Sequence, residues 1–127
     1  MDNQSHFSKR PISPHLTIYK LPLNAILSIL HRITGVGLFF AFAVISWWMI
    51  IFILSKFDPD IYLLKNSSFI TICLVATSFG FVYHLLNGIR HLLWDIGLFY
   101  GIRQMQITSV LTIILSIILT TLFWVML

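Results

Sequence analysis

A histidine lies inside one of the long apolar segments of this chain, in the stretch "ATSFGFVYHLLNGIRH". Four residues in this stretch recur at intervals of four, and a histidine follows three positions later: Ala76, Gly80, His84, Gly88 and His91. Such spacings share one face of an α-helix, so His84 would stand in a groove between two glycines. A neutral imidazole is a common ligand for a metal or a haem iron, and the groove would fit a flat cofactor. The pattern would equally serve close helix packing, with His84 hydrogen-bonded to a neighbouring helix.

Charged side chains follow His84. Arg90 and His91 lie about 10 Å further along a helix, where a cationic pair would suit carboxylates such as haem propionates. For Arg90 alone, a plain anchor at the inner face of a membrane is the favoured interpretation. Asp95 is expected to cap the helix or to pair locally.

A second polar cluster occupies the stretch "SILHRITG". Its members at positions i, i+3, i+4 and i+7 of one helix face are Ser28, His31, Arg32 and Gly35. A hydroxyl, an imidazole and a guanidinium at a membrane boundary would hydrogen-bond the carbonyl of a quinone whose tail lies in lipid. Snorkelling to lipid headgroups would explain Arg32, but it would not explain the serine and the histidine beside it.

The two helical histidines are not expected to bind one iron together. His31 lies just outside the first apolar run, whereas His84 lies roughly 9 Å inside the boundary of the second. Axial ligands must face each other across the iron, so this difference in depth disfavours the pair. The third apolar segment has no histidine. A haem with two histidine ligands would therefore need the second from another subunit.

The composition places these residues in a membrane. Of 127 residues, 58% are hydrophobic and only 9% are charged, whereas soluble domains carry about 25% charged residues. Three uncharged runs are long enough to cross a bilayer as helices. We predict an all-α integral membrane protein with three transmembrane helices at about 24–54, 67–90 and 107–127. They form a single anchor domain, residues 1–127, which includes a short N-terminal segment, 1–22.

The distribution of lysine and arginine predicts the orientation. Six fall on the side of the N-terminus and two on the opposite side: Lys9, Arg10, Lys20, Arg32, Arg90 and Arg103 against Lys56 and Lys65. The positive-inside rule puts segment 1–22 on the cytoplasmic or matrix side. These cations form no basic stripe, so nucleic acid is not an expected partner.

Other sequence features set narrower expectations. The first twenty residues show neither a signal-peptide nor a transit-peptide pattern, so the mature protein is expected to begin near Met1. The single cysteine, Cys73, allows no intrachain disulfide and no cysteine-based metal site. A stripe of small polar residues is expected to pack the third helix against its neighbours: Thr108, Thr112, Ser116 and Thr120.

Three stretches carry a family resemblance: "RPISPHLTIYK", "SILHRITG" and "HLLNGIRHLLWDIG". Together with the three-span layout, they resemble the cytochrome b556 subunits of succinate dehydrogenase, the large membrane anchors of respiratory complex II. The resemblance covers nearly the whole chain. It implies a second three-helix anchor subunit, and a flavoprotein with FAD and an iron–sulfur subunit on the inner face. It also implies reduction of ubiquinone at the boundary of a bacterial or mitochondrial inner membrane.

The resemblance assigns roles to individual residues. His84 matches the axial ligand of a b-type haem that is shared with the second anchor. Ser28 and Arg32 match quinone-site residues, and His31 matches a residue beside the haem propionates and the quinone pocket. His91 matches a position near the haem edge. The chain alone is expected to be non-catalytic, because FAD and the iron–sulfur clusters belong to its partners.

Three alternatives stay open. The chain could anchor a quinol:fumarate reductase, it could be a structural anchor without haem, or it could be an unrelated carrier that uses His84 and Asn87. Retention of the motif residues argues against loss of haem. Three spans without an inverted repeat argue against a transporter.

Overall fold

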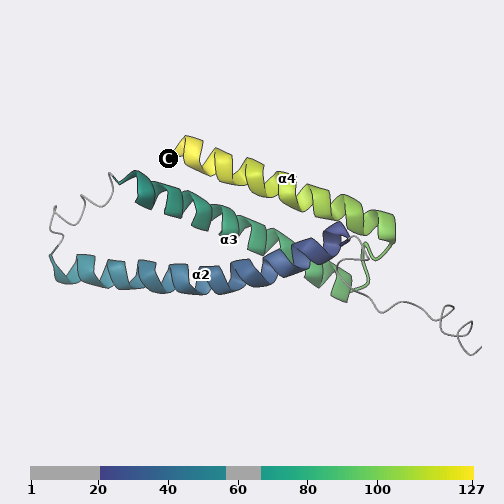
Figure 1. Cartoon of the computed structure of the whole chain (residues 1–127), viewed down its shortest axis with the longest axis horizontal. Helices are drawn as coiled ribbons and strands as arrows, with labels where there is room; N and C mark the ends of the chain where they lie inside the picture. Colours follow the sequence, from purple (N-terminus) through teal and green to yellow (C-terminus); the bar gives the residue numbers. More distant parts are fainter. Residues whose placement is uncertain (1–20, 57–66) are drawn as a thin grey trace, which may run out of the picture.

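Three long α-helices make up the fold. The computed structural model describes residues 21–56 and 67–127 (Figure 1). The helices are α2, Leu23–Leu54, α3, Ser68–Asp95, and α4, Ile102–Met126. Each is long and apolar enough to cross a membrane, so the chain is a multi-pass membrane protein. The predicted all-α class with three spans is confirmed. The predicted inner segment 1–22 lies almost entirely outside the described residues.

The helix ends follow from local chemistry. Pro22 is the N-cap of α2, where its lack of an N–H costs nothing, and its carbonyl accepts from the amide of Ala25. α2 ends at Leu54, and Lys56 turns the chain away with a positive φ of 54°. α3 ends in a turn at Gly97, whose φ of 81° suits glycine and whose amide donates to the carbonyl of Trp94.

Two helix boundaries differ from the prediction. α3 continues to Asp95 rather than stopping near residue 90, and α4 begins at Ile102 rather than at 107. The connector between them therefore consists only of residues 96–101. The predicted end of α3 coincides with the charge of Arg90, which a helix leaving the membrane would explain. Arg90 is instead only 4% exposed and lies within the bundle, and the helix continues past it to Asp95.

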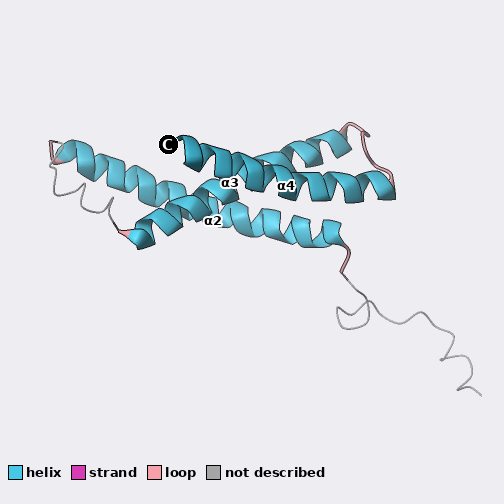
Figure 2. Cartoon of the chain, turned by 90° about the horizontal axis from the view of Figure 1, so that it is seen from above, coloured by secondary structure: helices cyan, strands magenta, loops and turns pink. Residues whose placement is uncertain are grey.

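The central helix is α3, which packs against both α2 and α4. In Figure 1, α2 and α3 separate toward the end at which α2 finishes, and in Figure 2, seen from above, the two helices cross. Figure 2 also shows only helices and loops in the described ranges. Contact between α2 and α3 is therefore concentrated toward one part of the bundle rather than spread evenly along it.

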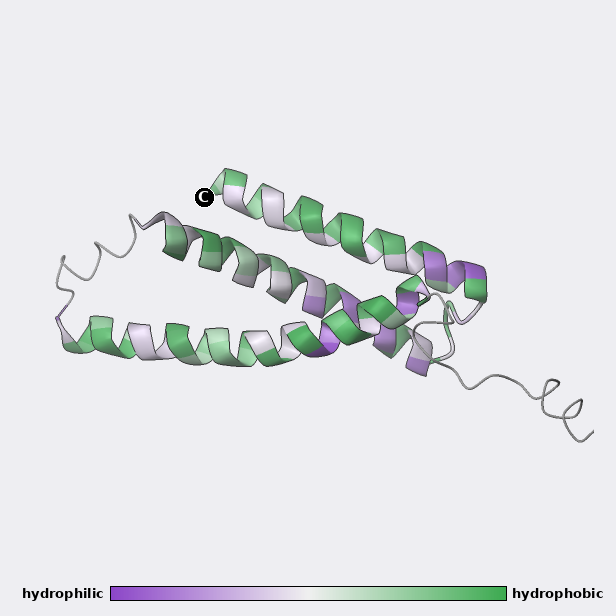
Figure 3. Ribbon diagram, in the orientation of Figure 1, coloured by the Kyte–Doolittle hydropathy of each residue, from purple (hydrophilic) through white to green (hydrophobic). Residues whose placement is uncertain are grey.

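Polar residues gather at one end of the bundle (Figure 3). This polar end comprises residues 23–35, 84–95 and 102–109, where α2 and α4 begin and α3 finishes. Large apolar side chains cover the outer surfaces of all three helices, as expected for contact with lipid or with another membrane subunit. The polar residues thus lie at the end of the bundle where α2 and α3 are in contact.

The polar stripe of α4 packs as predicted. Thr112, Ser116 and Thr120 are buried, and each hydroxyl donates to the carbonyl four residues earlier on its own helix. Their small side chains let the helices approach closely, and internal bonding satisfies their hydroxyls. Ser109 joins the buried set, whereas Thr108 is half-buried.

Candidate functional site

His31 and His84 are stacked against each other at the polar end. Their ring centroids are 3.9 Å apart and the planes are inclined by 11°. The expectation that the two histidines lie at different depths was therefore wrong. Arg90 does not mark a membrane boundary, because it is buried within the bundle and α3 continues past it to Asp95. His31 lies about 12 Å along α2 from its start and His84 about 16 Å along α3 from its end, and the stacking shows that the two rings lie side by side.

The imidazole of His84 is held by α2 through one ring nitrogen. Its Nδ1 lies 3.1 Å from the backbone carbonyl of His31 and 3.2 Å from Oγ1 of Thr34. A carbonyl oxygen can only accept a hydrogen bond, so Nδ1 carries the proton. The neutral ring then presents the lone pair of Nε2, which makes no hydrogen bond within the described ranges.

The glycines around the histidines have different surroundings. A Cβ on Gly35 of α2 would lie 3.0 Å from Cε1 of His84, and one on Gly88 would lie 3.8 Å from Cε1 of His31. Gly80, predicted to flank His84, has no such neighbour within 4 Å. The glycines next to a histidine ring are thus Gly35 on α2 and Gly88 on α3. The absence of a side chain at Gly35 leaves room for the His84 ring. Sequence reasoning had placed Gly35 on the face of His31 without connecting it to His84.

His91 completes a cluster of three histidines. Its ring centroid is 5.5 Å from that of His31 and 5.1 Å from that of Trp94, with an edge-on geometry in the second case. Nδ1 of His31 is buried and has no hydrogen-bond partner in the part of the chain that the structure describes. Nδ1 of His31 is therefore an atom of this cluster that can still form a hydrogen bond with a bound group.

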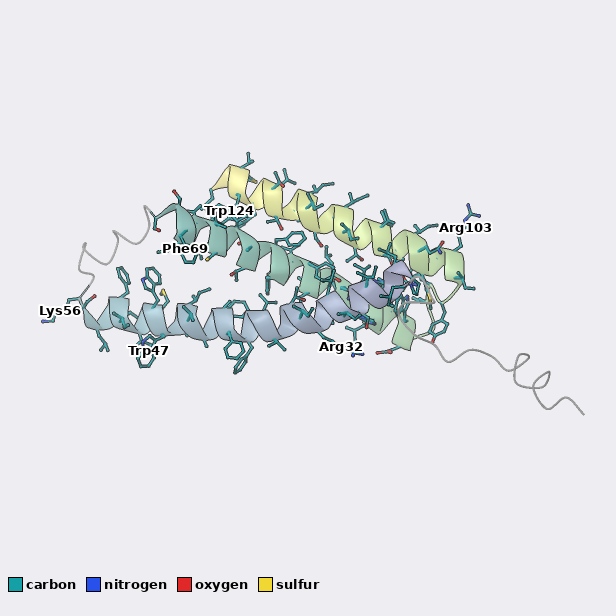
Figure 4. The ribbon with its side chains drawn as sticks, in the orientation of Figure 1. Arg32, Trp47, Lys56, Phe69, Arg103 and Trp124 are labelled. Carbon is teal, nitrogen blue, oxygen red and sulfur yellow. The ribbon has the colours of Figure 1, made fainter. Side chains whose placement is uncertain are left out.

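The two quinone-site candidates remain free to bind. Arg32 is exposed and Ser28 is half-buried, and neither makes a hydrogen bond or ion pair with another described residue. Figure 4 shows Arg32 on the side of α2 turned away from α4. Ser28 and His31 lie within one turn of each other on α2. The structure brings His31, His84 and His91 together, with Ser28 and Arg32 beside them on α2.

Arg90 belongs to a buried network rather than to the membrane interface. Nη1 donates to Oδ1 of Asn87 over 2.6 Å, and Nη2 donates to Oδ1 of Asn24 over 3.1 Å. Ser109 of α4 bonds the same oxygen of Asn24, and the guanidinium carbon lies 4.3 Å from the centre of the Trp94 ring. The interpretation of Arg90 as a plain anchor was therefore wrong.

This network was not predicted because its members are far apart in the sequence. Asn24, Arg90 and Ser109 come from α2, α3 and α4 and meet only in the folded bundle. The available signal was an asparagine at the start of one apolar helix and a serine near the start of another. Polar side chains at such places commonly bond between helices in membranes.

The three histidines are in ring contact, but among the described residues no group of three histidine, cysteine or acidic side chains is arranged so that it could hold a metal ion by itself. A single free Nε2, by contrast, fits a metal that is already held by a macrocycle. Haem iron needs only axial ligands from the protein. The donor set at the polar end therefore fits haem better than a bare metal ion.

Comparison with known proteins gives consistent matches. A family model described as "Succinate dehydrogenase/Fumarate reductase transmembrane subunit" matches residues 7–123. The chain is 52% identical over 122 residues to the succinate dehydrogenase cytochrome b556 subunit of Rickettsia felis, covering 96% of each chain. It is 38% identical over 117 residues to the Paracoccus denitrificans cytochrome b556 subunit, covering 89% of this chain and 88% of the relative. The mitochondrial cytochrome b560 subunit of Sus scrofa is 34% identical over 119 residues, 91% of this chain and 70% of the relative.

Proposed function

Because the chain belongs to the family of succinate dehydrogenase/fumarate reductase transmembrane subunits, we propose that it is the haem-binding membrane anchor of a succinate:ubiquinone oxidoreductase. It would supply one axial ligand to a b-type haem and part of the site that reduces ubiquinone. Residues 1–127 would form one anchor domain, with the N-terminus on the cytoplasmic or matrix side of an inner membrane.

One observation carries the haem assignment. Nδ1 of His84 donates to the carbonyl of His31, which leaves the lone pair of Nε2 available to iron. Metal-binding histidines in general donate their second ring nitrogen in this way, because the bond fixes both the tautomer and the ring orientation. His91 and the orphaned Nδ1 of His31 would lie near the edge of the bound group and its propionates.

The second axial ligand would come from another subunit. The rings of His31 and His84 face each other 3.9 Å apart, so their nitrogens cannot approach one iron from opposite sides. This stacking, rather than a difference in depth, supports the proposal that His31 and His84 do not bind one iron together. A second anchor subunit would complete the haem site, and a flavoprotein and an iron–sulfur subunit would dock at the inner face, where they would carry FAD and the clusters.

Ser28 and Arg32 would bind the head of the quinone. The Ser28 hydroxyl would donate to a carbonyl oxygen, and the Arg32 guanidinium would stabilise the negative charge that develops as the quinone is reduced. Both side chains are free of other partners among the described residues. Haem, when bound, supplies one-electron redox chemistry beside this site. Protons for the reduced quinone would come from the inner aqueous side.

A reduced-minus-oxidised visible spectrum of the purified complex tests this function. The expected result is a b-type α-band in the wild-type complex, which disappears in His84→Ala while the soluble subunits still co-purify. A wild-type complex without the band would refute the haem assignment and favour a structural anchor. A band that survives in His84→Ala would refute His84 as the ligand.

The direction of the reaction needs a separate measurement. The matched family includes fumarate reductases as well as succinate dehydrogenases, whereas the relatives compared above are named as succinate dehydrogenase subunits. We expect the purified complex to reduce ubiquinone with succinate faster than it reduces fumarate with a quinol. The opposite ratio would assign the chain to a fumarate reductase.

A further inference from the structure

The hydroxyl of Thr34 takes part in a three-membered contact with the two histidines. Oγ1 of Thr34 lies 3.0 Å from the carbonyl oxygen of His31 and 3.2 Å from Nδ1 of His84, and the latter two atoms are 3.1 Å apart. A threonine hydroxyl has one proton, and here it is donated to the His31 carbonyl. Oγ1 therefore turns a lone pair toward the N–H of His84, which is shared between two acceptors on α2.

The residue that follows Thr34 limits where the His84 ring can lie. A Cβ on Gly35 would lie 3.0 Å from Cε1 of His84, 3.7 Å from Nδ1 and 3.9 Å from Nε2. The first distance is shorter than carbon atoms normally tolerate, and the ring is fixed through Nδ1 on one side and by His31 on its face. Only a hydrogen at position 35 lets the imidazole lie flush against α2.

We propose that Thr34 and Gly35 are positioning residues for the haem ligand His84, an inference that rests on the proposed function. Thr34 provides a second acceptor for Nδ1–H, which strengthens electron donation by the imidazole to iron. Gly35 provides the clearance that sets the position of the ring. Acceptors behind a metal-bound imidazole raise its basicity and so favour the oxidised metal.

The role of Thr34 can be tested through the midpoint potential of the haem in the purified complex. Thr34→Val keeps the shape but removes the acceptor, so the one-electron equilibrium should shift toward the reduced haem by roughly tenfold, about 59 mV. Thr34→Ser should stay near the wild-type potential. Thr77→Val is the matched control, because that hydroxyl bonds only the carbonyl of Cys73 on its own helix. Equal potentials in Thr34→Val, Thr34→Ser and the wild type would overturn the role of Thr34.

The role of Gly35 can be tested by the haem content of the complex and by the spectrum of the haem. Gly35→Ala should lower haem affinity by about 10- to 100-fold, the loss usual for disturbed supporting residues, and should alter the spectrum of the remaining haem. Gly37→Ala is the control on the same helix, since a Cβ there meets nothing within 4 Å. Equal haem content and spectra in the two variants would overturn the role of Gly35.

Different results would contradict the proposed function and the positioning roles of Thr34 and Gly35. A wild-type complex without a b-type α-band refutes the proposed function. A wild-type band that His84→Ala abolishes, combined with no effect of Thr34→Val and Gly35→Ala, refutes only the positioning roles. If Gly35→Ala prevents assembly, Thr34→Val decides the outcome, because this substitution adds no volume to the helix contact.

Discussion

Nη2 of Arg90 on α3 donates a hydrogen bond to Oδ1 of Asn24 on α2 over 3.1 Å. Ser109 of α4 bonds the same oxygen, so one asparagine side chain joins all three helices. Arg90 has no acidic partner among the described residues, and neutral oxygens and the Trp94 ring stabilise its charge instead. The polar end is thus fixed by a network separate from the histidine cluster.

Removal of this guanidinium should loosen the bundle. Arg90→Ala deprives Asn24 and Asn87 of a charged donor, so we expect a loss of about 1–3 kcal/mol in stability. Arg90→Lys should recover only part of it, because an ammonium does not reproduce the planar fork. The measurement is the thermal unfolding midpoint of the purified complex. Arg103→Ala is the control, because Arg103 is exposed, and equal midpoints for the two alanine variants would contradict the prediction.

Loss of the proposed quinone ligands should separate two activities. Arg32→Ala should lower quinone reduction at least tenfold, since a donor that stabilises developing negative charge contributes on this scale or more. Ser28→Ala should act in the same direction. Succinate oxidation with an artificial acceptor should persist in both variants, and Arg103→Ala should retain both activities. Unchanged quinone reduction in Arg32→Ala would remove Arg32 from the site.

The hydroxyl of Tyr83 should contribute to the contact between α2 and α3. It donates to the carbonyl of Leu27 over 2.8 Å, and both side chains are buried. Tyr83→Phe should therefore cost about 1 kcal/mol, visible as a lower unfolding midpoint of the complex. Tyr100→Phe provides the comparison, because Tyr100 is 66% exposed. Identical midpoints would show that the bond adds nothing.

The buried stripe of α4 should tolerate small residues only. Ser116 is fully buried and bonds within its own helix, so Ser116→Ala should be nearly neutral while Ser116→Leu should cost about 1–3 kcal/mol through overpacking. Thr121→Leu changes an exposed residue of the same helix and should have little effect. The unfolding midpoint of the complex measures all three, and a harmless Ser116→Leu would contradict tight packing.

The three spans could be predicted because long uncharged runs leave few alternatives in a membrane. Their ends could not, because the sequence does not show whether a charged side chain is buried. Arg90 looked like the end of a helix, yet acceptors on Asn87 and Asn24 allow it to lie inside. Such acceptors lie up to 66 residues away in the sequence and become visible only in three dimensions.

The site was predictable at the level of residues and not at the level of contacts. Helical spacing identified His31, His84 and His91 as unusual, and the structure clusters them. The depth of each ring was misjudged, because spacing along one helix says nothing about how far a neighbouring helix is shifted. For the same reason, spacing placed Gly35 on the face of His31 but could not connect it with His84, and it gave no sign of the role of Thr34.

The bond between the His31 carbonyl and His84 has a consequence for how this site tolerates change. Every amino acid at position 31 brings the same main-chain oxygen, so a substitution there removes the covering ring but retains the acceptor. Selection on the side chain at position 31 is therefore independent of selection on the hydrogen bond that supports His84. A lineage could replace this histidine and still retain the main-chain acceptor for Nδ1 of His84, as long as α2 keeps its path.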